Sequence, residues 1–491
     1  MHFSLDRTSV RPLYRQLTHE IQQRIRSGAL PPGARLPPVR ELAQQLGVTR
    51  LTVHSAYSEL QAGGWVEATV GRGTFVAVQR DAAPAESDLG HELSHHGMIR
   101  DMLRMSQMPG MRSLAMADPA ADLYPAREFA RALEEALAHD PAAVFGYTSS
   151  QGEPLLRTVV AELLRGRGLR CGPDELLITS GVTQGLALVA RTLARPGDTV
   201  IVEQPTYVGA INVLARQGLR VLGVPVDEHG LLVEALEPLL IKERPKLIYV
   251  IPAFQNPSGV CMSLGRRAAL LALAERYRVP IVEDDIYAPI GLDRAALPAL
   301  KAADQSDLVI YISSFSKSLL PGVRIGYLAA SPALIKRIVA AKQADDLCSP
   351  PLLQRAMALF VERGQFTAHL RRVLPHYRDR RDAMLDAMAR YFPSTARWNL
   401  PEGGFSVWVR LPYGISTTDL YLAAIDRGVA FAPGDFFFPS PPAAPFIRLS
   451  YSSQSPQVIR EVTAVIGELL GTQLHRRSFS APALADYVPL V

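Results

Sequence analysis

The chain has 491 residues and a hydrophobic content of 48%, which suits two or three domains with buried cores. The three cysteines show neither disulfide nor metal-ligand spacing, the start lacks a signal-peptide pattern, and no apolar run approaches the ~20 residues that span a bilayer. These properties exclude a disulfide-rich secreted protein and a membrane protein, so we expect the cytoplasm.

The positive charge gathers at the start of the chain. Residues 1–78 contain nine arginines, no lysine and five acidic residues, and so carry +4 of the net charge of +5. A basic first module joined to a nearly neutral remainder indicates a polyanionic partner for that module alone. A charge of this size is also common on ordinary domains, so the charge alone does not identify a polyanion-binding module. The residue pattern of the module is the better indication.

Three helices are predicted in the first 61 residues. Apolar residues four apart predict a helix over 12–27, and a second helix over 39–46 ends at Gly47. Thr49 can cap a third helix that runs to about Gln61. Two short helices separated by a glycine-containing turn are typical of a helix-turn-helix, although a helical oligomerisation module is the alternative.

A hairpin follows the third helix. Residues 65–69 and 74–78 alternate as strands around a tip that contains Gly71 and Arg72, which predicts a wing. Arg50, Thr52 and His54 lie toward the exposed N-terminal half of the third helix. These are the positions that reach base edges when such a helix enters the major groove.

This region resembles the winged helix-turn-helix of the GntR family over some 70 residues. The matching segments are LPPVRELA at 36–43, GVTRLTV at 47–53 and GRGTFV at 71–76. The resemblance implies that four side chains touch operator DNA and that the wing near Gly71 and Arg72 lies in or beside the minor groove. The four are Arg40, Arg50, Thr52 and His54. Leu51 and His54 depart from the family pattern, which leaves the operator sequence open.

Residues 79–111 lose all periodicity and predict a flexible linker. His91, His95 and His96 could suggest a metal site, but no carboxylate or cysteine ligand set accompanies them. A tether of this length reaches on the order of 30 Å, enough to let the first module sit on a partner subunit.

From about residue 112 the pattern becomes helices alternating with short apolar strands. The strands are predicted at 175–179, 199–203, 247–251, 280–283 and 308–312. This is an α/β pattern with a mostly parallel sheet, in which ligands collect beyond the carboxyl ends of the strands. The polar residues that follow each strand are therefore candidates for a site.

Each strand end carries a group that pyridoxal 5'-phosphate (PLP) needs. A glycine turn at Gly181 opens a helix suited to a phosphate. Tyr207 could stack on a flat ring, Asn256 presents an amide, and Asp284 could keep a pyridine nitrogen protonated. Lys317, at the rim of the sheet, could hold an aldehyde.

Near Lys317, the hydroxyls of Ser314 and Ser316 and the guanidinium of Arg324 could bind a phosphate dianion. Each motif alone has an ordinary alternative. Lys317 could be a surface lysine in a serine-rich loop, Tyr207 a packing residue and Asp284 a helix cap. Five strand ends that all suit one cofactor favour the cofactor.

This ordered set resembles the fold-type I PLP enzymes, the aspartate aminotransferase superfamily, across roughly residues 112–472. The resemblance implies that Lys317 binds the cofactor aldehyde covalently, Asp284 the pyridine nitrogen, and Asn256 and Tyr287 the 3'-oxygen, with Tyr207 stacked on the ring. It implies a phosphate site of Gly181, Val182, Thr183, Ser314, Ser316 and Arg324. Tyr147 would reach the phosphate of a neighbouring subunit, which implies a dimer, and Arg448 would bind a substrate α-carboxylate.

The two resemblances in this order match the MocR (GabR-like) regulators. They imply a PLP-dependent DNA-binding transcriptional regulator, a head-to-tail homodimer, that senses a small amino compound; the amine would replace Lys317 on the cofactor. The expected domains are 1–78, the linker 79–111, 112–472 and a tail at 473–491 without pattern. A working aminotransferase with an auxiliary DNA-binding domain is the alternative, and a purely structural PLP site is a third hypothesis.

Overall fold

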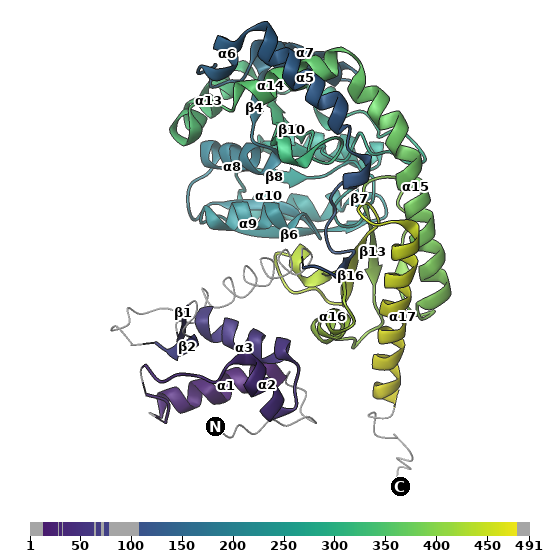
Figure 1. Cartoon of the computed structure of the whole chain (residues 1–491). Helices are drawn as coiled ribbons and strands as arrows, with labels where there is room; N and C mark the ends of the chain where they lie inside the picture. Colours follow the sequence, from purple (N-terminus) through teal and green to yellow (C-terminus); the bar gives the residue numbers. More distant parts are fainter. Residues whose placement is uncertain are drawn as a thin grey trace. The chain divides into compact units, whose positions relative to one another are not determined.

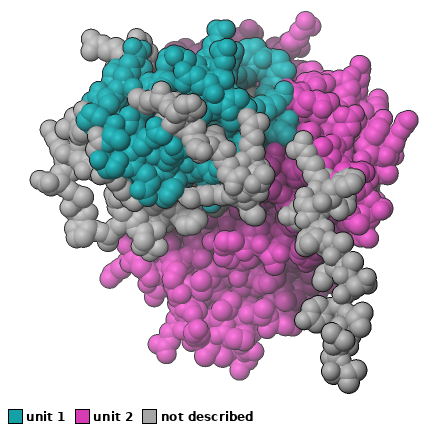
Figure 2. Space-filling model, turned by 90° about the horizontal axis from the view of Figure 1, so that it is seen from below, with its two compact units in different colours: residues 1–111, 421–426 teal, residues 112–420, 427–491 magenta. Residues whose placement is uncertain are grey.

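A computed structural model of the chain describes residues 13–27, 29–31, 33–62, 65–69, 73–77 and 108–478. The chain forms two compact units, residues 1–111 with 421–426, and residues 112–420 with 427–491 (Figure 2). Most of the predicted linker, the predicted wing tip at Gly71 and Arg72, and the end of the predicted tail lie outside the described residues.

The N-terminal unit contains the three predicted helices and the hairpin. Leu17, Ile21, Leu42, Val53 and Leu60 are fully buried and form its core. The elements are α1 (Leu13–Arg26), α2 (Val39–Leu46), α3 (Arg50–Ala62), β1 (Val66–Thr69) and β2 (Gly73–Val76). The two strands pair antiparallel, so the winged arrangement is confirmed.

Local chemistry explains where these helices begin and end. α2 ends at Gly47, which takes a left-handed φ of 61° and donates its N–H back to the last turn of the helix. The Thr49 hydroxyl accepts the N–H of Thr52 at 3.1 Å, so Thr49 caps α3 as predicted. The turn between α2 and α3 therefore follows directly from two residues.

The large unit is built on an eight-stranded sheet of order β4-β11-β10-β9-β8-β5-β6-β7. β10, β9, β8, β5 and β6 are parallel, whereas β11 is antiparallel to both of its neighbours. The strands are β4 (Leu176–Thr179), β5 (Thr199–Gln204), β6 (Arg220–Asp227), β7 (Gly230–Leu231), β8 (Ile248–Val250), β9 (Ile281–Asp284), β10 (Val309–Ser314) and β11 (Gly326–Ala329). All five predicted strands are present, and β6, β7 and β11 are additional.

Alternate residues of the central strands enter different cores, so the sheet is the middle of three layers. Val202, Tyr249 and Ile310 pack on one face with α8, α9 and α13, whereas Ile201 and Ile248 pack on the other. The helices around the sheet are α5 (Ala126–His139), α6 (Pro141–Phe145), α7 (Pro154–Arg165), α8 (Val182–Leu193), α9 (Val208–Arg216), α10 (Leu236–Glu243), α11 (Leu264–Tyr277), α12 (Leu300–Ala303), α13 (Pro332–Asp346) and α14 (Pro351–Glu362).

A smaller antiparallel sheet of order β12-β13-β16-β15 follows, and two long helices, α15 and α17, run side by side along it (Figure 1). The elements in this part of the chain are α15 (Gln365–Tyr391), β12 (Arg397–Trp398), β13 (Ser406–Arg410), α16 (Thr417–Asp426), β14 (Val429–Ala430), β15 (Ala432–Pro433), β16 (Phe446–Ser450) and α17 (Pro456–Ser478). α17 therefore continues past the predicted boundary at 472. No helix within the described ranges has the length and apolar character needed to span a bilayer.

A separate two-stranded sheet holds the beginning of the large unit beside this small sheet. β3 (Arg112–Ser113) pairs parallel with β14, and the Ser450 N–H donates to the Leu114 carbonyl oxygen at 2.8 Å. The loop that follows Leu114 is thereby anchored beside the end of β16.

Candidate functional site

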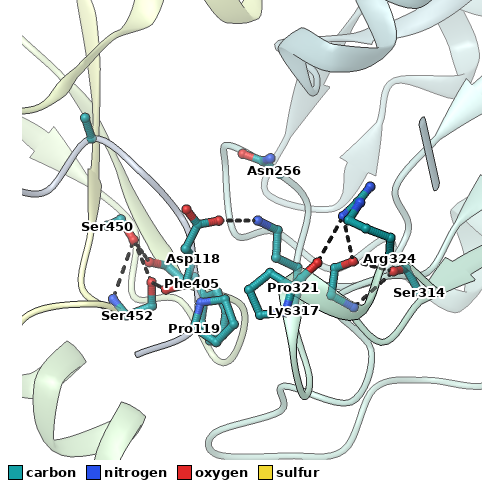
Figure 3. A network of polar contacts seen from close by, with 12 residues as sticks. Asp118, Pro119, Asn256, Ser314, Lys317, Pro321, Arg324, Phe405, Ser450 and Ser452 are labelled. Atoms are coloured by element: carbon teal, nitrogen blue, oxygen red, sulfur yellow. Dashed lines mark hydrogen bonds and ion pairs between the residues drawn. The ribbon is translucent and has the colours of Figure 1, made fainter. Parts of the chain in front are cut away.

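Lys317 lies just beyond the carboxyl end of β10, beside a cluster of hydroxyl and guanidinium groups (Figure 3). The Ser314 hydroxyl lies 2.8 Å from that of Ser316 and accepts the Ser316 N–H at 3.0 Å. Arg324 donates to the Ser316 hydroxyl at 3.3 Å and to the Ser180 carbonyl oxygen at 2.8 Å. The structure thus brings together Ser314, Ser316 and Arg324, as the sequence predicts.

Gly181 completes this cluster because only glycine fits there. Its φ is +101°, and an added Cβ would lie 2.7 Å from Nη2 of Arg324. Gly181 precedes α8, whose first turn contains Val182 and Thr183, so free backbone N–H groups and the positive helix end accompany the guanidinium. Gly181, α8 and Arg324 together make an anion-binding cup.

Asp284 ends β9 and is 2% exposed. Tyr249 donates its hydroxyl to Asp284 Oδ2 at 2.6 Å, and the Ile286 N–H lies 3.2 Å from Oδ1. Burial raises the pKa of Asp284 to about 7, against the lowering effect of the Tyr249 hydrogen bond. The carboxylate is suited to a protonated ring nitrogen, whose positive charge would balance the negative charge of the buried Asp284.

Two further residues of this region escaped the sequence-based prediction. Tyr249 is fully buried, and a lone hydroxyl in an aliphatic strand was the available indication. Glu203 accepts hydrogen bonds from the Ile251 N–H at 3.0 Å and from Gln255 Nε2 at 3.1 Å, and burial raises its pKa to about 8. Burial also raises the pKa of Tyr207, which lies beside Thr183.

Arg448 is a buried guanidinium, only 6% exposed. Nη1 donates to Asn256 Oδ1 at 3.0 Å, Nη2 donates to the Ala115 carbonyl oxygen at 2.5 Å, and the group lies 4.8 Å from the centre of the Phe437 ring. Its Nε is buried without a hydrogen-bond partner, and within the described ranges Arg448 forms no salt bridge. Such a cation is suited to an incoming carboxylate.

An unpredicted carboxylate faces the lysine. Lys317 Nζ lies 2.8 Å from Asp118 Oδ1 (Figure 3). Tyr287, 4% exposed, packs edge-on against Phe405 with ring centres 5.8 Å apart, and burial raises its pKa far above the usual range. Tyr147 instead projects into solvent, with 89% of its surface exposed.

The winged unit presents its own candidate surface. Arg40, Arg50 and His54 are exposed, and Thr52 is half-buried with its hydroxyl 2.9 Å from that of Thr49. The opposite face of α3 is buried, and Tyr57 donates to the Pro37 carbonyl oxygen at 2.8 Å, which fixes α3 against the start of α2. The N-terminal half of α3 is therefore free to meet a groove.

Comparison with known proteins places both units. Residues 114–466 match the aminotransferase class I and II family, and residues 13–76 match the gntR family of bacterial regulatory proteins. The chain is 33% identical to the probable rhizopine catabolism regulatory protein MocR of Rhizobium meliloti, over 93% of each chain. The chain belongs to the MocR-like regulators of the GntR family.

Other relatives agree with this membership. The MocR-like chain is 34% identical to the HTH-type transcriptional regulator TauR of Rhodobacter capsulatus, over 93% of this chain and 96% of TauR. LysN, an α-aminoadipate aminotransferase of Thermus thermophilus solved with N-(5'-phosphopyridoxyl)-L-leucine, matches 77% of this chain and 95% of its own, with 36% identity and a TM-score of 0.72.

PLP is accordingly the cofactor of this MocR-like chain, and the site has the chemistry to hold it. The cup of Gly181, α8 and Arg324 suits the phosphate, Asp284 suits the ring nitrogen, and Lys317 offers an amine to the aldehyde. The cradle is so tight at Gly181 that a methyl group would displace Arg324.

The raised pKa of Asp284 predicts a pH-dependent contribution to stability in cofactor-free protein. The folded value of about 7 lies above the ordinary value of 3.8, so the folded protein binds more protons between these pH values. The stabilising contribution is therefore full below the lower value and is lost as pH rises toward the higher one. Against Asp284→Asn, the melting temperature of the wild type should fall as pH rises through this window and stay level above it.

Asp174→Asn is the matched control, because the Asp174 side chain is 95% exposed. Its melting curve should follow that of the wild type at every pH. Parallel melting profiles for the wild type and Asp284→Asn would contradict the assigned titration.

Proposed function

We propose that the chain senses an amine that also carries an acid group, and that this binding alters how the winged units engage operator DNA in the cytoplasm. The buried Arg448 guanidinium carries the proposal, since it has an unpartnered Nε. Arg448 and Lys317 would both border the cofactor site. An amino acid could therefore bind Arg448 through its acid group while its amine replaces Lys317 on the cofactor.

Each predicted residue has a proposed role in the large unit. Gly181, Val182, Thr183, Ser314, Ser316 and Arg324 would hold the phosphate, Asp284 the ring nitrogen, and Asn256 and Tyr287 the 3'-oxygen, with Tyr207 stacked on the ring. PLP supplies an aldehyde that condenses with amines and a ring that accepts electrons. Arg448 donates to the Asn256 amide oxygen at 3.0 Å and so orients the amide. The proposed acid-binding residue thereby contacts a proposed cofactor-binding residue.

A head-to-tail homodimer is part of the proposal. Phe145 and Tyr147 are 76% and 89% exposed, and two neighbouring exposed aromatic residues favour burial against another chain. Tyr147 would then reach the phosphate of the partner subunit. In such a dimer, each winged unit would be tethered by residues 79–111 over the other subunit.

A working aminotransferase is the second candidate, and a specific observation favours it. The chain is 38% identical over 375 residues to the 2-aminoadipate transaminase of Thermus thermophilus, over 76% of this chain and 93% of that enzyme. Steady turnover of amino and keto acids at about 1 to 10³ per second would support the enzyme. Amine binding without such turnover would support the sensor.

One experiment tests the proposal directly. Candidate amines are titrated into the PLP-loaded protein while the visible absorbance and the affinity for the DNA upstream of its own gene are followed together. A sensor should change both at the same amine concentration. An absorbance change with constant DNA affinity would contradict sensing, and no response in either would leave a purely structural PLP site.

Arg50→Ala should weaken specific operator binding by ~1 to 3 kcal/mol, because Arg50 opens α3 and is exposed there. The measurement is a gel shift on operator and on scrambled DNA at one salt concentration. Arg15→Ala, which removes an exposed arginine from α1, is the matched control and should lower both affinities slightly and equally. Wild-type specificity in Arg50→Ala would place base recognition elsewhere.

A further inference from the structure

Asp118 and Lys317 come from opposite parts of the large unit and meet in a partly buried ion pair. Their side chains are 43% and 24% exposed, and Asp118 Oδ1 lies 2.8 Å from Lys317 Nζ. The Asp118 backbone is held near the end of β16, since the hydroxyl of Ser452, just beyond that strand, donates to the Asp118 carbonyl oxygen at 2.5 Å. Figure 3 shows the carboxylate pointing at the amine across the gap between the two loops.

Among the described residues, Lys317 is the one that forms an ion pair with Asp118. The Nη donors of Arg448 point at Asn256 and Ala115, so within the described residues Arg448 forms no ion pair with Asp118. Asp118 acts electrostatically on Tyr124 and Tyr287, and burial raises the pKa of both. These tyrosines are neutral near pH 7. Asp118 also acts electrostatically on Arg448, but Lys317 is the cation with which it forms the ion pair.

We infer that Asp118 holds the Lys317 amine in this ion pair whenever the lysine is not bonded to the cofactor, and so makes the nitrogen less available to react. An ammonium nitrogen has no lone pair, so it can neither attack an aldehyde nor accept a proton from the carbon of a bound amine. Asp118 is then a positioning residue that acts through Lys317. The site would bind an amine and carry the chemistry further only slowly, which suits a sensor better than an enzyme.

This inference deepens the proposed function, on which its biological meaning rests, but its chemistry can be tested without DNA or effector. The lone pair of Lys317 is measured on full-length, cofactor-free protein by competitive acetylation at neutral pH. Mass spectrometry compares Lys317 with Lys336, an exposed lysine on α13 that serves as the internal reference.

Asp118→Asn should raise the relative reactivity of Lys317 by about 3- to 10-fold, a range set by the partial exposure of the pair. PLP capture by the same protein should accelerate by a similar factor. Asp118→Glu, which keeps the charge, should restore slow acetylation and slow capture, whereas a merely structural aspartate would give the same result in both variants.

The wild type provides a measurement that does not depend on the folding of a variant. Raising the salt concentration from about 0.05 M to about 1 M screens the ion pair, so the acetylation of Lys317 relative to Lys336 should increase. Unchanged Lys317 reactivity, both in Asp118→Asn and at high salt, would overturn the inference. Weaker amine binding in Asp118→Asn with unchanged Lys317 reactivity would also overturn it and make Asp118 an effector ligand.

The two proposals fail separately. If Lys317 becomes more reactive in Asp118→Asn but amines leave the DNA affinity of the wild type unchanged, the ion-pair inference stands and sensing is wrong. In Asp118→Asn loaded with PLP, the hydrogen on the carbon of a bound amino acid should exchange with deuterated solvent faster than in the wild type. Equal exchange rates would contradict a role for Asp118 in keeping the Lys317 amine from accepting that proton.

Discussion

Lys317→Ala is expected to abolish the visible absorbance band of PLP-loaded protein while leaving a folded dimer. The variant removes the amine that would bond to the cofactor aldehyde, whereas the contact of Arg324 with Ser316 beside the proposed phosphate site stays intact. Its effect on folding should be small, at most about 1 kcal/mol, because the partner Asp118 is 43% exposed and remains hydrated. Absorbance spectra after incubation with PLP and gel filtration check the two halves of this prediction.

Lys336→Ala is the matched control for Lys317→Ala, because it removes an exposed lysine of the same unit and should leave the band unchanged. Free PLP is removed by gel filtration before each spectrum. A band of wild-type position and intensity in Lys317→Ala would end the assignment of Lys317 as the cofactor lysine.

Arg448→Lys is expected to weaken the binding of amines that carry an acid group by about 2 to 4 kcal/mol, or roughly 30- to 1,000-fold. Lysine keeps the charge but loses the planar fork that can bind a carboxylate through two bonds. Lysine also has one nitrogen, which cannot occupy both positions from which Nη1 and Nη2 now donate to Asn256 Oδ1 and the Ala115 carbonyl oxygen. The change is measured by titrating the absorbance band of PLP-loaded protein.

The loss should be much larger for amines with an acid group than for a simple alkyl amine, because an alkyl amine has no carboxylate to bind Arg448. Arg410→Lys is the matched control, since Arg410 ends the neighbouring strand β13 and is exposed. Equal affinity of Arg448→Lys and wild type for acid-bearing amines would place acid recognition on another residue.

The positions of the predicted cofactor residues could be read from the sequence because each follows a strand. A short apolar run fixes a strand, and parallel strands place their carboxyl ends at one edge of a sheet. Tyr207, Asn256, Asp284 and Lys317 were predicted as cofactor residues in this way. β11 was not predicted, because its four residues, Gly326–Ala329, begin with glycine and end with alanine, two residue types that are depleted in strands.

Asp118 and Tyr249 show the limit of such reading. Asp118 lies 199 residues from Lys317 along the chain, and their contact depends on the pairing of β3 with β14, two strands of two residues each. Tyr249 sits inside a buried strand, where its hydroxyl finds Asp284 only because β8 and β9 are parallel neighbours. Contacts of this kind depend on register, which local patterns do not contain.

The close approach of Gly326 to Gly181 gives the phosphate cup a second consequence. A Cβ on Gly326 would lie 2.6 Å from the Gly181 Cα, and the Arg324 guanidinium meets the Ser180 carbonyl oxygen across 144 residues of chain. The cup therefore forms only after β11 has inserted between β4 and β10. A chain in which β11 has not yet inserted lacks this cup. At a hundred times its dissociation constant, the cofactor would favour the finished fold by about 2.7 kcal/mol. In a cell with too little PLP, the folded protein would be less stable, and the cell would contain less of it.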